Sequence, residues 1–148
     1  MLVYRERLWP SLWLFLSTAL VIPASLLVFA PISLAVGVAT AIILYGGCTA
    51  LLVTTSPLVE VTTKTLRAGR ATISLSLVGE TVGYAGPEAF AQRGTALNAR
   101  SWLLLRGSLD GVVVVPIVDP NDPTPYWVIS TRQPQQLAAA INDKPQSR

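Results

Sequence analysis

One uncharged stretch constrains this chain more than any other feature. From Leu8 to Val59, 52 consecutive residues include no Asp, Glu, Lys or Arg, and most are Leu, Val, Ala, Ile, Phe or Trp. A transmembrane helix needs about 20 mainly apolar residues to cross the hydrocarbon core of a bilayer. The stretch is long enough for two crossings and too short for three, so it predicts a helical hairpin in a membrane.

The first predicted span covers residues 10–29. Trp9 and Trp13 lie near its start, where aromatic side chains anchor helices at the interface between lipid and water. Pro23 lies inside the span and predicts a kink, which membrane helices tolerate because neighbouring groups satisfy the freed carbonyl.

The second predicted span, residues 32–53, is rich in small residues. Gly37 and Ala41 are four apart, as are Gly46 and Ala50, so the two members of each pair lie on one face. Small residues let helices approach closely in a membrane. We expect these faces to pack this helix against the first one; the alternative is contact with a second copy of the chain, which would give a homo-oligomer.

Basic residues flank the apolar block at both outer ends. Arg5 and Arg7 precede it, Lys64, Arg67 and Arg70 follow it, and the expected turn between the spans carries no charge. Because basic residues stay preferentially on the cytoplasmic side, we expect a multi-pass protein of the plasma (inner) membrane with both termini in the cytoplasm. A cleaved signal peptide is disfavoured because the apolar run continues through a second helix length.

Composition argues against several kinds of chemistry. The chain has one cysteine, Cys48, and no histidine, so a zinc or iron site would consist almost wholly of carboxylates. A net charge of +3 from 11 basic and 8 acidic residues falls short of the basic stripe of nucleic-acid-binding proteins. No His or Lys is placed as a base for a Ser or Thr nucleophile. We expect no catalytic residue, metal or cofactor.

After the apolar block the pattern changes to short, partly alternating, β-branched runs, which predict strands. Asp110-Gly111 separates two such runs and predicts a β-hairpin between them. Pro116 favours an edge strand or a bulge. The predicted strands are residues 58–63, 66–68, 71–77, 79–84, 102–105, 112–115 and 126–131.

Two short helices complete the predicted domain. One covers residues 87–93, and a C-terminal one covers residues 133–141, each with a proline in its first turn. This order predicts an α+β protein: a transmembrane hairpin, then an antiparallel, pleckstrin-homology-like (PH-like) β-barrel or sheet with a C-terminal helix. The expected parts are a cytoplasmic N-terminal segment (1–9), the hairpin (10–54), the cytoplasmic β-rich domain (58–142) and a flexible tail (143–148).

Four segments carry a resemblance to a known family. They are residues 4–10 (YRERLWP), 66–69 (LRAG), 119–127 (DPNDPTPYW) and 130–132 (STR). In these segments the chain resembles an actinobacterial family of small membrane proteins of unknown function. The resemblance implies two membrane helices, a cytoplasmic domain and no established activity. A remoter similarity, based on element order, is to bacterial PH-like domains.

The candidate contact residues are few. Asp119 and Asp122 are close enough in sequence to hold a cation, but Asp before Pro usually shapes a turn, which we favour. Tyr126 and Trp127 are candidate aromatic anchors for a partner or lipid, and strand alternation places one of them in the core. Arg132 is a candidate ion-pair partner of these carboxylates.

The residues at the membrane end suggest a second contact. Lys64, Arg67 and Arg70 follow the second span, where anionic lipid head groups would lie. The leading hypothesis is a non-enzymatic membrane protein whose cytoplasmic domain binds a membrane or cytoplasmic protein partner or organises an assembly. The alternative is sensing of anionic lipid head groups by the PH-like domain. An enzyme or transporter is disfavoured because the membrane block has no ionisable Asp, Glu, Lys or Arg to mark a pathway.

Overall fold

The computed structural model describes residues 1–143 of the 148-residue chain, which form two compact units. One unit is the apolar block, Trp9–Ser56. The other combines Met1–Leu8 with the chain from Pro57 onward, and we call it the β domain. The tail expected over residues 143–148 lies, from residue 144, outside the described residues.

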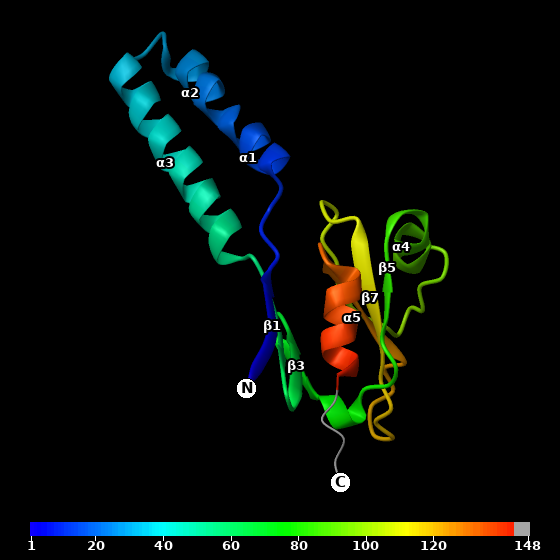
Figure 1. Ribbon diagram of the computed structural model, residues 1–148. Coiled ribbons are helices and arrows are strands. Elements are labelled where there is room, and N and C mark those ends of the chain that lie inside the picture. Colours follow the sequence, from blue (N-terminus) through cyan, green and yellow to red (C-terminus); the bar gives the residue numbers. More distant parts are fainter. Residues whose placement is uncertain (144–148) are drawn as a thin grey trace. The chain divides into compact units, whose positions relative to one another are not determined.

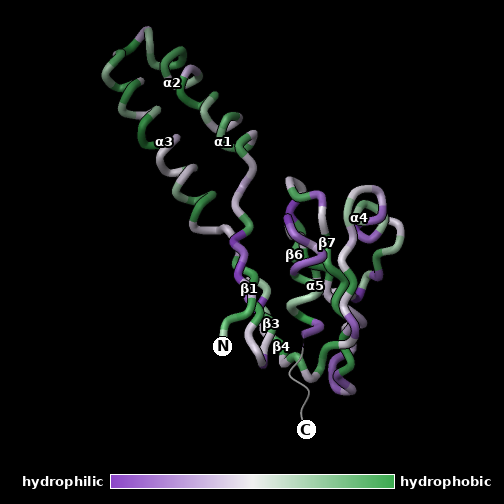
Figure 2. The backbone as a smooth tube through the Cα atoms, in the orientation of Figure 1, coloured by the Kyte–Doolittle hydropathy of each residue, from purple (hydrophilic) through white to green (hydrophobic). Residues whose placement is uncertain are grey.

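The apolar unit consists of helices α1 (Leu12–Ala19), α2 (Val21–Phe29) and α3 (Leu34–Thr54). Figure 2 shows their backbone mostly in hydrophobic green and near-neutral pale tones. Two helical segments, Leu12–Phe29 and Leu34–Thr54, are long and apolar enough to cross a membrane. The two apolar helical stretches expected near the N-terminus are therefore present.

The first apolar stretch is interrupted at Leu20 because of the proline inside it. Pro23 has no backbone N–H, and its ring crowds the carbonyl four residues earlier, that of Ala19. The chain forms a tighter turn in which Leu20 N donates to Ser17 O at 3.2 Å, and α2 begins at the next residue. The kink expected at Pro23 appears as a break three residues upstream.

Small residues of α3 pack against α2. Gly37 and Ala41 are buried in α3, and a Cβ at Gly37 would lie 3.4 Å from Phe29 Cβ and 3.5 Å from Leu26 Cα. A Cβ at Gly46 would meet nothing within 4 Å. The expected packing face is confirmed at Gly37 and Ala41, whereas Gly46 faces open space within the chain.

The β domain begins with a four-stranded antiparallel sheet, the first sheet, in the order β1-β2-β3-β4. Every second residue of β2 and β3 is fully buried, while the residues between are polar or partly exposed. A short 3-10 turn, η1 (Leu75–Leu77), follows β4. The strands are β1 (Leu2–Arg7), β2 (Leu58–Thr62), β3 (Thr65–Ala68) and β4 (Ala71–Ser74).

The strand pattern of the sequence does not predict β1. It pairs antiparallel with β2, with Arg7 opposite Leu58, and the following Leu8 is fully buried in the core. The N-terminal segment expected as a separate part over residues 1–9 thus belongs to the β domain up to Leu8. An exposed strand edge offers unpaired backbone groups, and β1 satisfies those of β2.

The second sheet is mixed and has the order β5-β7-β8-β6. Strand β7 pairs antiparallel with β5 and β8, whereas β6 runs parallel to β8. Helix α4 (Gly86–Arg93) packs on one face of this sheet and α5 (Pro134–Asn142) on the other (Figure 1). The strands are β5 (Val82–Tyr84), β6 (Trp102–Leu104), β7 (Gly111–Pro116) and β8 (Tyr126–Thr131).

Two predictions for this sheet are wrong. Asp110-Gly111 does not close a hairpin, since β6 and β7 both pair with β8 and not with each other. The segment before β7 is held by longer-range contacts: Arg106 N donates to Ser130 Oγ at 2.9 Å, and Leu109 is buried. Pro116 does not mark an edge strand, because β7 is an inner strand and Pro116 is its last residue, where a missing N–H costs little.

The two sheets and α5 enclose the main core, and no barrel is closed among the described residues. Among the described residues, the strand pairing between the two sheets beyond η1 is an isolated bridge between Val78 and Ile117, so the backbone ladder does not continue around a barrel. The α+β expectation is confirmed and the closed PH-like barrel is not. Core residues from both sheets and α5 include Leu8, Val59, Val61, Leu66, Val113, Val115, Ile129, Leu137 and Ile141.

Candidate functional site

The two ends of the β domain meet at the carboxylate of Glu6. Its Oε2 accepts hydrogen bonds from Tyr4 Oη at 2.8 Å and from Thr131 Oγ1, and its Oε1 accepts one from Arg132 N at 3.0 Å. The guanidinium of Arg132 lies 3.7 Å from Oε1 and donates to Arg7 O at 3.3 Å. We call these five residues the Glu6 cluster; it ties β1 to the chain just after β8.

The Tyr4 phenol of this cluster has a raised pKa. Burial raises the pKa of the Tyr4 phenol to about 12, and the Glu6 carboxylate acts in the same direction while the Thr131 hydroxyl opposes it. A phenol that keeps its proton can donate to Glu6 throughout the neutral range. Sequence reasoning expected Arg132 to pair with Asp119 or Asp122; the structure pairs it with Glu6 instead.

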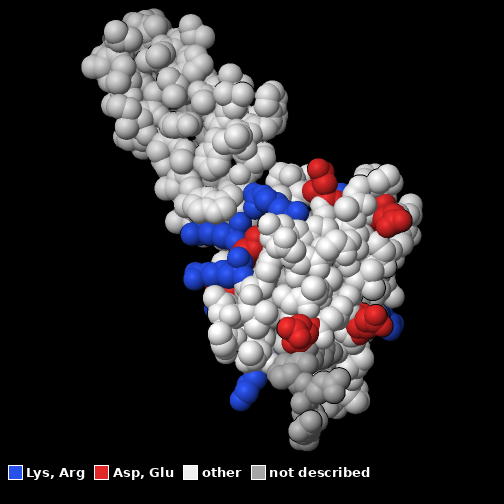
Figure 3. Space-filling model, in the orientation of Figure 1, with Lys and Arg blue, Asp and Glu red and all other residues white. Residues whose placement is uncertain are grey.

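The second group of charges lies on the outer face of the first sheet. Glu60 of β2 lies opposite Arg5 of β1 and Arg67 of β3. Its carboxylate is 3.4 Å from Arg5 Nε and 3.9 Å from Arg67 Nη1. One carboxylate therefore faces two arginines. Most of the Lys and Arg side chains visible in Figure 3 gather along one side of the domain.

Arg70 lies in the turn between β3 and β4. The turn depends on Gly69, whose φ of +60° is in the left-handed region that favours glycine. Gly69 N donates to Leu58 O at 2.8 Å, and Arg67 Nε donates to Gly69 O at 3.3 Å. The turn thus lies at the end of the sheet where β2 begins and β1 ends. We call this the proximal end, because both connections to the apolar unit leave from it.

Lys64 lies at the opposite end of the same sheet. It occupies the turn between β2 and β3, beside Thr63, whose N–H donates to Met1 O at 3.0 Å. Five residues of β2 separate the two ends, which is about 15 Å of strand. The structure brings Arg67 and Arg70 together at the proximal end and leaves Lys64 out.

The predicted aromatic pair has structural contacts. Trp127 is 6% exposed and stacks at a tilt on Trp102, with ring centroids 4.8 Å apart. Tyr126 lies on the other face; its Oη accepts from Asn98 N at 2.7 Å and donates to Ala96 O at 3.1 Å. The expectation that one of the two residues is in the core is confirmed, with Trp127 inside.

The two loop aspartates shape turns. Asp119 Oδ1 accepts from Asn121 N, and Asp122 Oδ1 accepts from Thr124 N, each at 2.9 Å. Hydrogen bonds from the side chain and backbone of Thr124 lower the pKa of Asp122. The turn interpretation is confirmed for both residues. In the described part of the chain, no group of three or more His, Cys, Asp or Glu residues could hold a metal ion.

An apolar row crosses the second sheet on the face that carries α4. Register places Val82, Val114, Val128 and Leu103 side by side on β5, β7, β8 and β6. Val128 is buried beneath α4, whereas Val82 is 45% and Leu103 42% exposed. We call these four residues the apolar row. The sequence gives only the alternation of each strand; which strands adjoin, and hence the row, depends on the sheet order.

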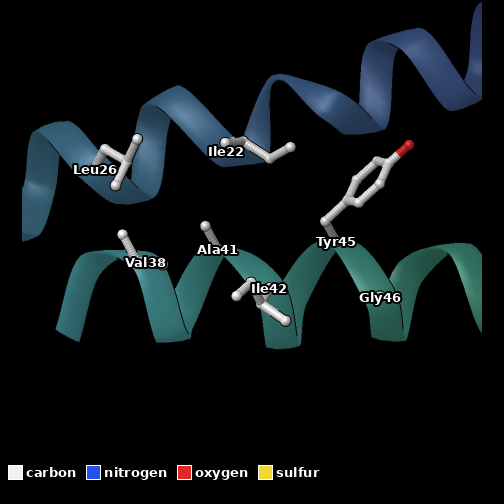
Figure 4. A pocket seen from close by; sticks show the side chains of 7 residues that line it. All are labelled: Ile22, Leu26, Val38, Ala41, Ile42, Tyr45 and Gly46. Carbon is white, nitrogen blue, oxygen red and sulfur yellow. The ribbon is translucent and has the colours of Figure 1, made fainter. Parts of the chain in front are cut away.

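A further hollow lies within the apolar unit, between α2 and α3. It has a volume of about 320 Å³ and an almost wholly apolar lining. Figure 4 shows Ile22 and Leu26 on α2 facing Val38 and Ala41 on α3, with the ring of Tyr45 directed toward the opposite helix. No charged side chain lines it. Its surface matches a lipid-like environment, and among its lining residues Tyr45 carries the one side-chain hydroxyl.

Sequence reasoning did not single out Tyr4, Arg5, Glu6 and Glu60 as contact residues. Residues 4–7 are Tyr-Arg-Glu-Arg, and Glu60 is the single acidic residue in a β-rich run. The contacts of Arg5 with Glu60 and of Glu6 with Arg132 join residues more than 50 positions apart in sequence, so no local pattern predicts them.

A family model described as "Protein of unknown function (DUF3093)" matches residues 3–141. No curated protein and no solved structure matches the chain. The match covers the Glu6 cluster, the apolar block and both sheets, and it agrees with the resemblance to a family of unknown function.

Proposed function

The chain belongs to this family of proteins of unknown function, and we propose that it is a two-span integral membrane protein that holds a small α+β domain at the cytoplasmic face, where the domain binds a protein partner without catalysing a reaction. The observation that carries the proposal is the pairing of β1 with β2, the two strands that flank the apolar unit.

The apolar helices support membrane insertion. Only 6% of the Leu12–Phe29 segment and 11% of the Leu34–Thr54 window is buried within the chain. A helix that is hydrophobic on every side needs an apolar environment, either a protein core or a membrane. Since the chain itself covers so little of these helices, lipid is the environment that fits them, and the lack of charge from Leu8 to Val59 is consistent with it.

The strand pairing supports two crossings. Strands β1 and β2 lie next to each other in one sheet, so the segments before and after the apolar unit are on the same side of any membrane it enters. A return to the starting side requires an even number of crossings. The same pairing argues against a cleaved signal sequence, because removal of β1 would take Leu8 out of the core and Glu6 away from Arg132.

The charge distribution supports the cytoplasmic side. Arg5, Arg7, Arg67 and Arg70 lie on the β domain close in sequence to the helices, and the connection between α2 and α3, residues 30–33, carries no charge. Basic residues near the ends of spans favour the cytoplasm.

The contacts of the carboxylates support a non-enzymatic role. Glu6 and Glu60 are bound to arginines, and Asp119 and Asp122 accept backbone hydrogen bonds in turns. The apolar row supports partner binding. Partly exposed apolar side chains that lie together on one face of a sheet are typical of interaction surfaces.

The proposal is tested with the full chain in native membranes. A photo-crosslinking residue at Val82 or Leu103 should capture another protein, and the matched residue at Ser76, exposed and outside the row, should not. A Glu substitution at Val114 should abolish capture from Val82. Partner binding would be contradicted if the probes crosslinked the chain only to other copies of itself, or if the Ser76 probe captured protein equally well. Membrane insertion would be contradicted if alkaline carbonate released the chain from the membranes.

A further inference from the structure

The proximal end of the first sheet concentrates arginines. Arg7 is exposed at the end of β1, Arg70 is exposed in the β3–β4 turn, and Arg67 reaches toward that turn through its bond to Gly69 O. Arg67 faces the carboxylate of Glu60, which it shares with Arg5. The group therefore has an excess of positive charge.

The contacts that hold Arg67 leave it suited to a further anion. Its guanidinium has five N–H donors in a planar fork. One donates to Gly69 O, and the 3.9 Å separation from Glu60 is a loose ion pair on a side chain that is 56% exposed. A phosphate group is the anion that an arginine fork binds through two parallel hydrogen bonds.

We propose that the proximal end, through Arg7, Arg67 and Arg70, binds the phosphate groups of anionic lipids in the membrane that holds the chain; this rests on the proposed two-span anchoring. Four residues separate Arg7 from the start of α1, and three separate the end of α3 from β2. These short connections keep the proximal end within reach of the head groups, whose negative charge is complementary to the arginines.

Lys64 provides an internal control. It lies about 15 Å of strand farther from the connections, while the Debye length at physiological ionic strength is about 8 Å. A charge at that distance contributes little attraction to a lipid surface. The proposal thus distinguishes three residues that the sequence presents as one basic group.

The experiment uses the full chain, because a fragment beginning at Leu58 lacks β1 and with it Leu8 of the core. The chain is extracted from membranes in mild detergent and offered an equal mixture of phosphatidylglycerol and phosphatidylcholine, and native mass spectrometry measures which lipid it retains. We expect the wild-type chain to prefer phosphatidylglycerol. Because each basic residue near an anionic surface contributes about fivefold, R67Q/R70Q should reduce the preference by about 30-fold.

The control variants test whether the lipid preference comes from the arginines of the proximal end. K64Q should retain the preference, and R67K/R70K should retain much of it because the charges remain. Equal loss in K64Q, no preference in the wild-type chain, or displacement of the lipid by added inorganic phosphate would overturn the proposal. If R67Q/R70Q does not fold, the wild-type chain is tested instead by hydrogen exchange in nanodiscs with and without phosphatidylglycerol. The proposal predicts greater protection of the β3–β4 turn when phosphatidylglycerol is present, and equal protection would overturn it. A chain that stays in carbonate-washed membranes but shows no lipid preference refutes this inference and leaves the membrane anchoring standing.

Discussion

Glu6 and Arg132, 126 residues apart in sequence, are bound to each other through both the backbone amide and the guanidinium of Arg132. The contact joins the two parts of the β domain: β1 comes before the helices in the sequence, and Arg132 comes after the last strand. The chain therefore returns to its own N-terminus after leaving the apolar unit. The sequence alone predicts an anchor followed by a separate domain. In the structure the β domain also includes the first strand, and the apolar helices are inserted after that strand.

Removal of the Glu6 carboxylate should destabilise the β domain. The Glu6→Ala variant leaves Thr131 Oγ1 and Arg132 N without their acceptor in a site where the Glu6 side chain is only 12% exposed. Loss of a buried acceptor costs about 1–3 kcal/mol. Thermal unfolding of the full chain in detergent, followed by tryptophan fluorescence, measures the change. Glu80→Ala, on an exposed side chain, is the matched control, and equal midpoints for the two variants would refute the role of the cluster.

Stability should fall at alkaline pH because of Tyr4. Its pKa is raised from 10.0 to about 12 in the folded chain, so the folded state keeps the phenolic proton after the unfolded state has lost it. The stabilisation is present below pH 10 and is lost as the pH rises through 12. Ultraviolet titration of the full chain should include a late tyrosine ionisation, near pH 12. Tyr4→Phe should remove that late step, and a late step that persists in the variant would assign it to another tyrosine.

A methyl group at Gly83 should disrupt the contact between β5 and α5. A Cβ at this position would lie 2.5 Å from Pro134 O and 3.2 Å from Gln135 N, both backbone atoms. Overpacking of this kind typically costs about 1–3 kcal/mol. Gly107→Ala is the control, since its Cβ would meet nothing within 4 Å. Denaturant unfolding compares the two, and a Gly83→Ala chain as stable as Gly107→Ala would show that the helix does not pack this closely.

The helix contact in the apolar unit makes a matching prediction. Gly37→Leu should separate α3 from α2, because a side chain there meets Phe29 and Leu26, whereas Gly46→Leu should be tolerated. The measurement is disulfide formation between cysteines at Ile22 and Ala41, which line the same hollow, in a Cys48→Ala background. Reduced crosslinking in the Gly37 variant alone is the expected result. Reduced crosslinking in both, or in neither, would contradict this packing.

The local parts of the fold could be predicted from sequence, and the non-local ones could not. The apolar helices, β2, β8 and both amphipathic helices follow from hydropathy, alternation and the position of a proline, all of which are local signals. Strand β1 carries three charges in six residues and resembles a membrane flank. It becomes a strand only because β2, more than 50 residues later, offers a partner.

Topology explains the other differences. Asp110-Gly111 has the composition of a hairpin turn, but β6 pairs in parallel with β8. No local sequence pattern predicts that pairing. The candidate contacts show the same limit. Arg67 and Arg70 are close in sequence and in space, while Lys64, equally close in sequence, lies at the other end of a strand. The pairing of Glu6 with Arg132 could not be predicted, because the two residues are 126 positions apart in sequence and no local pattern connects them.

The most direct test of two crossings with both ends on one side is accessibility of single cysteines to a membrane-impermeant maleimide, in a Cys48→Ala background. One cysteine replaces Ile32, between α2 and α3, and the other replaces Lys64, in the β domain. In intact cells, the Ile32→Cys chain should be labelled, and the Lys64→Cys chain should be labelled only after the cells are opened. Labelling of both positions from the same side would contradict a hairpin that crosses the membrane and returns.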